Sequence, residues 1–527
     1  MSSSLSRRRF LQLAGLGGLG VLAGWPPFSL SGSNLLAAED PASELAVDLQ
    51  AARDAVPILP GRNTEVWRFR GTVLSGDQGQ LVANPESYLG PTFRVRKGQT
   101  LSVNFRNQLP EPSIVHWHGL HVPDDMDGHP RLVVAGGETY PYRFKVLNRA
   151  GTYWYHPHPH NRTGFQVYGG MAGFFIVHDE EEDALGLPSG EFDVPLLLQD
   201  RRFDASNQLV YVTSPQEWMH GLLGDTVLIN GRPRHSMEVA RRSYRLRLLN
   251  GSNSRIYKLA WEDGTPLTVI GTDGGLLERP EPRDFLYFGP GERLDLWVDF
   301  SNHAVGSTLR LISRSEPALS ETGMGMMRSG AAVPNGAPLS LLTFKVARES
   351  ATNQPLPKTL TPLEPVSPEQ AYNHGRPKTF QLQMSHMRWT INGRSFQMYG
   401  VAPEEVVRLG RPEIWEFVND GHGMGRMGGM GRGRRGRGRG GRGMMGMMQM
   451  PHPMHIHGLQ FRVINRIGPW PSAGFMDQGW KDTVLVMPGE RVQVLVNFPH
   501  YSGLFLYHCH ILEHEDRGMM RNLEVRP

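Results

Sequence analysis

Histidines gather in four short groups along this chain of 527 residues. Within a group the histidines are two to four residues apart, and one group also holds the chain's single cysteine. Alternate residues of a β-strand point to the same face, so a His-x-His pair can direct two imidazoles at one ion or one pair of ions. Four such groups predict metal sites rather than packed core histidines. The groups are His116-Trp117-His118, His156-Pro157-His158, His452-Pro453-Met454-His455-Ile456-His457, and His508-Cys509-His510 with His514.

The tripeptide His508-Cys509-His510 is the most informative of these motifs. On a strand, the cysteine sulfur faces one side and both imidazoles face the other, so metals on the two sides are joined by a short covalent path. Together with His452, His514 and Met519, Cys509 makes a His₂Cys set with a weak thioether, which is the ligand set of blue copper. Redox-inert zinc would have no use for such a path. The sequence therefore predicts copper and electron transfer.

Three stretches of the chain repeat one another weakly, which predicts three domains of one kind. Ile229-Asn230-Gly231-Arg232 recurs at 391–394, and Pro290-Gly291-Glu292-Arg293 recurs at 488–491. A fainter third copy lies at 95–107 and 136–146. Around these motifs apolar and polar residues alternate between Gly and Pro turns, which is typical of short antiparallel strands. We therefore expect an all-β chain with three β-sandwich domains at about 50–180, 190–348 and 375–527, and a Pro-rich linker at 349–374.

The third domain is expected to carry an insertion. The two Ile-Asn-Gly-Arg motifs are 162 residues apart, whereas the two Pro-Gly-Glu-Arg motifs are 198 residues apart. The tract at about 421–450 accounts for the difference, and it holds thirteen glycines, seven arginines and eight methionines. Such a composition cannot bury a core of its own.

In order and spacing, the four histidine groups resemble the signature motifs of the multicopper oxidases. The resemblance spans essentially the whole chain after the N-terminus, and it is strongest to the bacterial three-domain branch of periplasmic cuprous oxidases and bacterial laccases. It implies cupredoxin-like Greek-key β-sandwiches, four copper ions, and a second domain that binds no copper and acts as a spacer. By the family pattern, type 1 copper takes His452, Cys509, His514 and Met519, type 2 copper takes His116 and His455, and the type 3 pair takes His118, His156, His158, His457, His508 and His510.

The resemblance also implies that electrons pass singly from a reducing substrate to type 1 copper, and that O₂ is reduced to water at the other three coppers. That reaction needs protons, and Asp127 and Glu515 stand where the family places acids beside the cluster. Each acid can supply a proton or can orient a histidine through a hydrogen bond. We expect His160 to be such a hydrogen-bonding neighbour rather than a ligand, and His121 to lie outside the cluster.

The N-terminus resembles an export signal. Ser6-Arg7-Arg8-Arg9-Phe10 precedes a short apolar run at 13–25, and the paired arginines are similar to a twin-arginine signal. A membrane anchor is the alternative, but the run is short and interrupted by glycine. We expect residues 1–38 to direct export to the periplasm by the twin-arginine machinery and to be removed, leaving no membrane span.

The formal net charge of +4 comes from two arginine clusters. Three arginines belong to the signal and seven lie between Arg426 and Arg442, so the rest of the chain carries about −6. A mildly acidic body with one basic segment does not favour nucleic-acid binding, and we expect none. We also expect a monomer.

The reducing substrate is less well specified. The 421–450 tract can be a passive insertion, a loop whose methionine sulfurs bind Cu(I), or a cationic cover that attracts anionic phenolics. Its arginines repel Cu(I), and Met448 stands where the cuprous-oxidase pattern has an acidic residue. The prediction is therefore Cu(I), phenolic compounds or both, with a role in periplasmic copper tolerance.

Two other functions share features with this sequence. A copper-free binding protein of the cell envelope can have the same fold, but the complete ligand set argues against it. A two-domain copper nitrite reductase is shorter and lacks the paired cluster histidines in this order.

Overall fold

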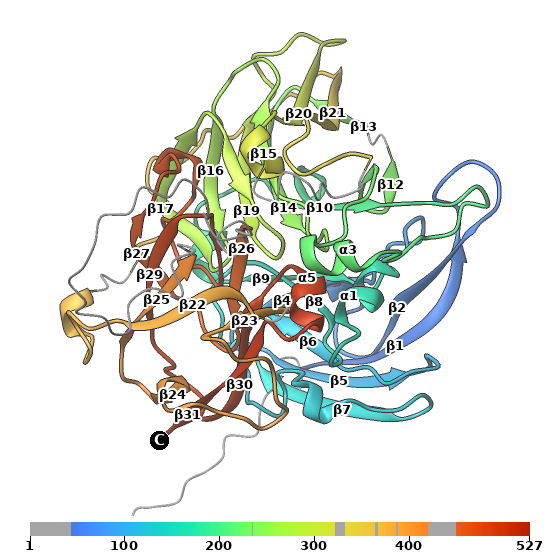
Figure 1. The fold of residues 1–527 in the computed structure, drawn as a ribbon. Coiled ribbons are helices and arrows are strands. Elements are labelled where there is room, and N and C mark those ends of the chain that lie inside the picture. Colours follow the sequence, from blue (N-terminus) through green and yellow to red (C-terminus); the bar gives the residue numbers. More distant parts are fainter. Residues whose placement is uncertain (1–43, 234–235, 322–331, 364–366, 386–387, 420–449) are drawn as a thin grey trace, which may run out of the picture. The chain divides into compact units, whose positions relative to one another are not determined.

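The computed structural model describes residues 44–233, 236–321, 332–363, 367–385, 388–419 and 450–527 (Figure 1). The predicted signal at 1–38 and nearly all of the 421–450 tract lie outside these residues. Within them, strands dominate and form six sheets, while the helices are short. The helices are α1 (Thr163–Tyr168), α2 (Glu180–Asp183), α3 (Pro215–His220), α4 (Pro317–Glu321) and α5 (Leu512–Asp516). The all-β prediction is confirmed.

The six sheets of the described residues come as three successive pairs along the chain. The first pair contains β2 (Thr64–Ser75), β1 (Glu44–Val56), β5 (Thr100–Asn107) and β7 (Thr139–Lys145), and, in its second sheet, β3 (Leu81–Val82), β4 (Thr92–Arg96), β9 (Gly173–His178), β8 (Gly151–Pro157) and β6 (Val115–His118). The middle pair contains β12 (Arg232–Pro233), β11 (Thr226–Ile229), β10 (Asp193–Arg201), β14 (Ser243–Asn250), β19 (Arg293–Asp299), β16 (Leu267–Thr272) and β17 (Gly275–Arg283), and, in its second sheet, β13 (Ser236–Ala240), β21 (Leu339–Arg348), β20 (Thr308–Ser313), β15 (Tyr257–Trp261) and β18 (Leu286–Phe288). The third pair contains β23 (Arg388–Ile391), β22 (Lys378–Ser385), β25 (Glu413–Asn419), β29 (Glu490–Val496) and β27 (Arg462–Ile467), and, in its second sheet, β24 (Val406–Arg408), β31 (Met520–Arg526), β30 (Gly503–Cys509), β26 (His452–Ile456) and β28 (Thr483–Val486).

The same topology recurs in all three pairs. In each first sheet, the opening strand lies parallel to a strand that also has an antiparallel partner, as in β1–β5–β7, β10–β14–β19 and β22–β25–β29. In each second sheet, four strands follow one order: β4-β9-β8-β6, β13-β21-β20-β15 and β24-β31-β30-β26. The weak sequence repeats therefore correspond to equivalent strands. The exact domain boundaries at 50–180, 190–348 and 375–527 stay a prediction.

The repeated Asn-Gly motif has a local structural reason. Asn230 and Asn392 have φ of 48° and 53°, and the glycines that follow them have φ of 78° and 72°. Two successive positive φ angles define the two-residue turn that matches the twist of a hairpin, and Asn-Gly is the sequence best suited to it. Each asparagine Oδ1 also accepts a backbone N–H, from Leu197 (2.8 Å) in one copy and from Gln381 (2.7 Å) in the other.

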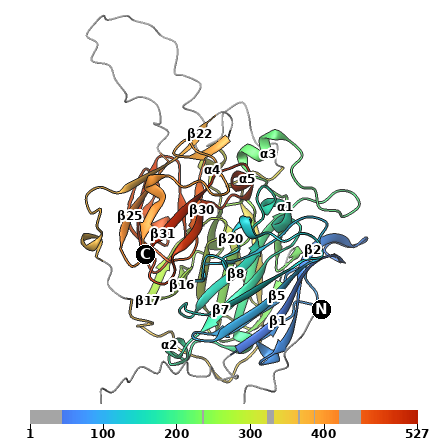
Figure 2. The same cartoon turned by 90° about the horizontal axis from the view of Figure 1, so that it is seen from below.

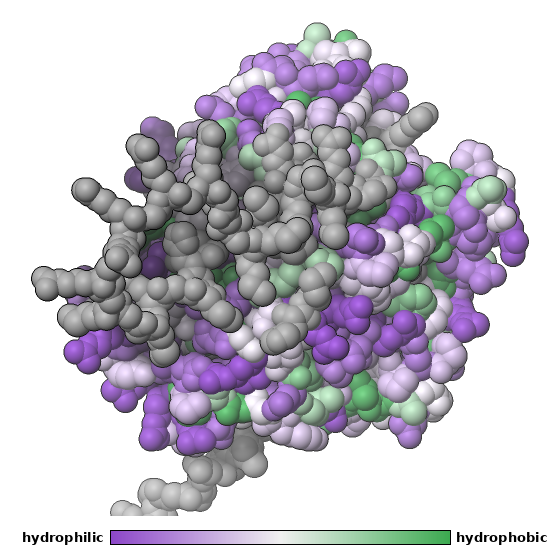
Figure 3. Space-filling view, viewed as in Figure 1, coloured by the Kyte–Doolittle hydropathy of each residue, from purple (hydrophilic) through white to green (hydrophobic). Residues whose placement is uncertain are grey.

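Each pair of sheets encloses a hydrophobic core of its own. The third core contains Cys509 and Met519 among aromatic and aliphatic side chains. Helix α5 packs against both α1 and α3 (Figure 1, Figure 2). On the face shown in Figure 3, hydrophobic residues are scattered among hydrophilic ones. Among the described residues, every helix is too short or too polar to cross a bilayer.

Candidate metal centre

The four histidine groups occupy equivalent strands of the first and third pairs of sheets. β6 and β8 pair antiparallel with His116 opposite His156, and β26 and β30 pair antiparallel with His455 opposite His508. Each pairing therefore brings two groups together on neighbouring strands. The equivalent strands of the middle pair, β15 and β20, have no histidine in their sequences and offer no imidazole.

Eight of these histidines meet in one buried cluster between the first and third pairs of sheets. Nε2 of His116 lies 3.4 Å from Nε2 of His455, and Nε2 of His158 lies 3.4 Å from Nε2 of His508. These contacts join residues more than 300 positions apart, so the cluster exists only when the two pairs of sheets pack together. Its members are His116, His118, His156, His158, His455, His457, His508 and His510, each at most 1% exposed.

Most of these rings have one nitrogen fixed by an oxygen acceptor. Nδ1–H of His116 donates to the carbonyl of Asp127 (2.7 Å), and Nδ1–H of His455 donates to the carbonyl of Asp482 (2.8 Å). Nδ1–H of His457 donates to Oδ2 of Asp127 (2.7 Å). Such a bond fixes the tautomer and leaves the lone pair of the other nitrogen facing the cluster.

The ring nitrogens that face the interior of the cluster are better suited to binding metal ions than to hydrogen-bonding one another. Burial lowers the pKa of His118, His156 and His455 well below the usual range, so these rings are neutral. Where Nδ1–H of both rings is donated to an oxygen, the two Nε2 atoms turn lone pairs toward each other at 3.1–3.4 Å and gain no hydrogen bond. Both ring nitrogens of His510 are buried without a hydrogen-bond partner among the described residues. The donor set therefore fits cations held between the rings, and imidazole is a good ligand for copper.

A second site lies beside β30 and combines one sulfur with two imidazoles. Nδ1 of His452 is 3.4 Å from Sγ of Cys509, and Nδ1 of His514 is 3.7 Å from it. Met519 is equally buried, and its carbonyl accepts the N–H of Cys509. Burial raises the pKa of the Cys509 thiol above its usual range, so the thiolate requires a bound cation. This soft donor set fits copper.

Residues that the sequence analysis did not single out cover this second site. Nε2–H of His514 donates to the carbonyl of Met219 (2.9 Å) at the end of α3, and the indole N–H of Trp389 donates to the same carbonyl (2.7 Å). The Trp389 ring centroid lies 4.7 Å from that of His452 and 5.2 Å from that of His514. The bond at Nε2 turns the other nitrogen of His514 toward Cys509.

Both predicted acids contact histidines of the cluster. Oδ1 of Asp127 lies 3.5 Å from Nδ1 of His116, in addition to the bond that its Oδ2 accepts from His457. Oε2 of Glu515 lies 3.0 Å from Nδ1 of His508, and Oε1 lies 3.5 Å from Nε2 of His158. Burial raises the pKa of Asp127 above its usual range, although the neighbouring His116 partly opposes this shift. A carboxyl with a raised pKa is suited to holding a proton.

Asp482 is a cluster residue that the sequence analysis missed. Its Oδ1 lies 3.1 Å from Nε2 of His118 and 3.6 Å from Nδ1 of His455. Arg293, from the middle pair of sheets, donates through Nη1 to Oδ1 (2.7 Å) and through Nη2 to Oδ2. The middle sheets therefore hold one carboxylate in place at the cluster.

The internal repeats explain why Asp482 is hard to identify as a cluster residue from the sequence. It stands six residues before Pro488, and Asp284 stands six residues before Pro290 in the middle repeat. Because the middle repeat has no histidine groups, an aspartate shared by both copies suggests a structural role. Only the packing of β28 beside the histidines distinguishes the two positions.

Helix α5 fixes the second site to both neighbouring pairs of sheets. The carboxylate of Glu513 accepts from Nδ2 of Asn253 (2.8 Å) and from Oγ of Ser254 (2.6 Å), both in the middle pair. The carboxylate of Asp516 accepts the backbone N–H groups of residues 163–164 at the start of α1 (2.9 Å each). His514 and Glu515 lie between Glu513 and Asp516 on this helix, so these hydrogen bonds fix the positions of both.

His160 and His121 lie outside these groups of ligand atoms. Nδ1 of His160 is buried without a partner among the described residues, and its ring centroid lies 4.9 Å from that of Phe396. His121 instead approaches His500, with ring centroids 5.2 Å apart. Neither residue belongs to a group of cluster ligand atoms, but among the described residues His160 makes no hydrogen bond to a cluster histidine, so its expected role as a hydrogen-bonding neighbour is not seen.

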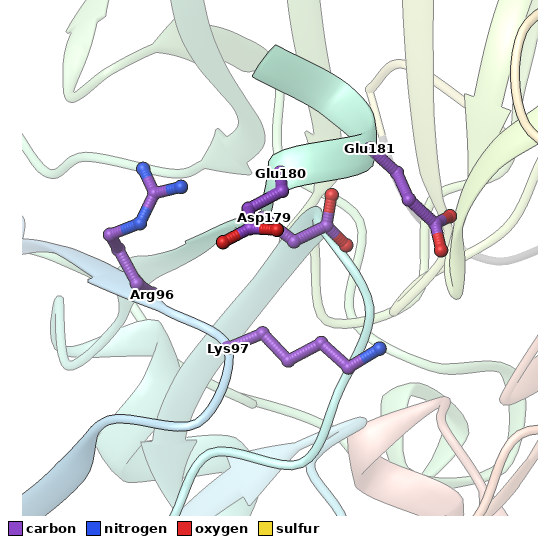
Figure 4. Close-up of a pocket in the computed structure, with 5 residues that line it drawn as sticks. All are labelled: Arg96, Lys97, Asp179, Glu180 and Glu181. Carbon is purple, nitrogen blue, oxygen red and sulfur yellow. The ribbon is translucent and has the colours of Figure 1, made fainter. Parts of the chain in front are cut away.

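A surface pocket near α2 has a different character. Its lining residues are Arg96, Lys97, Asp179, Glu180 and Glu181, all of them charged (Figure 4). Opposite charges offset one another there, and none of the predicted ligands lines the pocket. It is therefore not part of the metal centre.

Comparisons with known proteins cover the whole of this architecture. Two family models, both described as multicopper oxidase, match residues 68–182 and 372–527, which together hold all four histidine groups. The McoA multicopper oxidase of Aquifex aeolicus is 36% identical, with a TM-score of 0.74 over 92% of this chain and 96% of its own. The multicopper oxidase mco of Staphylococcus aureus is 30% identical over 83% of this chain and 82% of its own. The cell division protein FtsP of Xenorhabdus nematophila is 29% identical over 99% of each chain. The likeness to McoA confirms the predicted fold of three cupredoxin-like sandwiches.

Proposed function

Because the chain belongs to the multicopper oxidase family, we propose that it oxidises Cu(I) and phenolic compounds one electron at a time at the Cys509 site and reduces O₂ to water at the eight-histidine cluster. One copper ion is assigned to the Cys509 site and three to the cluster. The arrangement of β30 carries the proposal, because Cys509 approaches His452 and His514 while His508 and His510 belong to the cluster. Bound copper supplies the reversible one-electron chemistry.

The protein's own groups have distinct tasks in this proposal. The backbone of β30 connects the two sites through adjacent residues, and its pairing with β26 and β31 keeps their separation fixed. Full burial of the cluster histidines limits access of bulk water. Asp127, whose pKa burial raises, is placed to hold a proton beside the cluster. Although burial opposes the shift, His158 and His508 lower the pKa of Glu515, so Glu515 stays a carboxylate that orients these rings. Asp482 and Arg293 orient the ring of His118.

The surroundings of His514 support Cu(I) as a substrate. Helix α3 ends beside this ring with Met219 and His220, a thioether and an imidazole, which are both ligands for Cu(I). Nε2 of His220 is buried without a hydrogen-bond partner among the described residues, and burial lowers its pKa, so the ring is neutral. A Cu(I) ion bound there would deliver its electron close to the Cys509 site.

His220→Ala should therefore lower kcat/KM for Cu(I) about tenfold, equivalent to roughly 1.4 kcal/mol, and leave kcat/KM for dimethoxyphenol within about twofold. The reason is that a phenol needs no imidazole ligand on α3. Oxygen uptake with Cu(I), dimethoxyphenol and bilirubin, measured side by side, provides the test. His303→Ala, which removes a half-buried histidine of the middle pair, is the matched control. Equal loss with all substrates would show that α3 supports the fold around His514 and does not bind Cu(I).

A copper-free binding protein of the cell envelope is the second candidate, because the chain is also similar to FtsP, a protein named for cell division and not for oxidation. It predicts a colourless protein that purifies without copper even when copper is supplied. The oxidase predicts four copper ions per chain and a blue colour from the Cys509 thiolate bound to copper. The buried, unpartnered donors of both sites support the oxidase, because a protein that bound no cation would leave them unsatisfied.

We further propose that the protein acts in the periplasm in copper tolerance, as a monomer exported through the twin-arginine pathway. The paired arginines Arg7 and Arg8 support the route, because they precede a short apolar run as in a twin-arginine signal. Replacing Arg7 and Arg8 with lysine should leave the protein in the cytoplasm, as measured by cell fractionation. Replacing Arg426 and Arg432 with lysine, far from the signal, is the control. Normal export of the first variant would contradict the proposed route.

A further inference from the structure

His121 and His500 form a pair of histidines that the oxidase sites do not use. His121 lies in the loop after β6, and His500 lies in the loop between β29 and β30. Their ring centroids are 5.2 Å apart and their planes are inclined by 44°. The pair thus joins a loop of the first pair of sheets to a loop of the third.

The two loops are held together independently of this pair. Oδ2 of Asp124, three residues after His121, accepts the backbone N–H of Leu504 at the start of β30 (3.0 Å). The backbone N–H of His121 donates to Oδ1 of Asn148 (2.9 Å). These bonds fix the backbone of the loop after β6 relative to the start of β30, which limits how far the two loops can separate.

The spacing of the pair matches that of the predicted copper ligands. The ring centroids of His452 and His514 are 5.3 Å apart, and those of His457 and His508 are 5.2 Å apart. Two imidazoles that share one ion must leave room for it between them, and the centroid distance of His121 and His500 is compatible with one ion between the rings.

No direct hydrogen bond joins the two rings. Both ring nitrogens of His121 are buried, and among the described residues neither makes a hydrogen bond of good geometry, which excludes an N–H···N bond to His500. Burial, with a smaller contribution from His500, lowers the pKa of His121 to about 4, and a weak interaction with the side chain of Gln460 opposes this shift, so the ring is neutral and retains a lone pair. A buried polar group without a partner is costly, and binding a cation would satisfy it.

We propose that His121 and His500 form a separate mononuclear site for a copper or zinc ion. The two imidazoles provide two ligands, and the exposed position of His500 lets water complete the coordination. An ion bound there would link the loops that follow β6 and precede β30, both of which lead to the histidine cluster. This proposal does not depend on the oxidase activity.

Isothermal titration of the fully copper-loaded protein with Zn²⁺ tests the site. Zn²⁺ is the probe because thioethers bind it poorly, so the methionine-rich tract contributes little. The wild-type protein should take up one Zn²⁺ in addition to its copper. His500→Ala should weaken this binding at least about tenfold, since even residues that only support a ligand change metal affinity by that much. His374→Ala, which removes another exposed histidine, should leave the affinity unchanged.

Two further measurements make the result decisive. His121→Ala should weaken Zn²⁺ binding as much as His500→Ala does, and both variants should keep the visible absorption of the copper-loaded protein, which shows that the Cys509 site is intact. Cu²⁺ should displace the bound Zn²⁺, because imidazole sites prefer Cu²⁺. The proposal is wrong if the wild-type protein takes up no additional Zn²⁺, or if both variants bind it as tightly as the wild type.

Discussion

Cys509→Ser should give a colourless protein without oxidase activity and with an unchanged fold. Serine fills nearly the same space, but its hydroxyl is not a soft anionic ligand and cannot provide the thiolate that gives blue copper its colour. Electrons from the substrate would then have no route into β30. Visible absorption and oxygen uptake measure the two losses, and thermal unfolding of the copper-free proteins measures the fold.

The controls for this replacement separate the site from the core that surrounds it. Ile511→Val removes one buried methylene from the residue whose backbone N–H donates to the same sulfur, keeps that N–H, and should keep both colour and activity. Copper analysis of the serine variant should show a loss of one ion per chain, because the cluster keeps all eight histidines. A variant that stays blue and active would overturn the assignment of the Cys509 site. A wild-type protein that binds no copper would favour the copper-free alternative.

The grouping of the histidines was predictable because local spacing determines which face of a strand each side chain occupies. His116 and His118, like His508 and His510, share a face by their two-residue separation, whatever the rest of the chain does. The conformation of the Asn-Gly turns is also predictable from sequence, because it depends only on adjacent residues. The sequence repeats indicated which strands are equivalent in different domains. This explains why two histidine groups lie on neighbouring strands in the first domain and two in the third.

The supporting residues were not predictable, because they depend on how one pair of sheets packs on another. Arg293 reaches Asp482 across 189 positions, and Met219 reaches His514 across 295. The residues around these contacts show no spacing that would predict them. The motif that contains Arg293 also recurs at 488–491, at the start of β29, which holds none of the predicted ligands. For the same reason the description of the middle domain as a spacer was incomplete, since its residues contact both sites.

Asp127→Asn should slow the reaction with O₂ about 100-fold or more, the range typical of a lost proton-transfer group, while reduction of the Cys509 site by substrate stays close to the wild-type rate. Asparagine can still accept the hydrogen bond of His457 through its amide oxygen, so the ring stays oriented. It cannot hold a proton as a carboxyl can, and the proton requirement arises only when O₂ is reduced. Anaerobic stopped-flow reduction isolates the first step, and reoxidation of the reduced protein by O₂ isolates the second.

The exposed Asp125, two residues earlier in the same loop, provides the matched control for this experiment. Asp125→Asn removes the same charge from the loop without touching a cluster histidine, so both steps should keep their wild-type rates. Glu515→Gln should resemble Asp127→Asn, because this carboxylate also lies beside cluster histidines. Copper content has to stay at the wild-type level in all three variants, since a lost ion would slow O₂ reduction for a different reason. Equal slowing of both steps in Asp127→Asn would mean that the carboxylate maintains the packing between the first and third pairs of sheets and has no specific part in proton delivery.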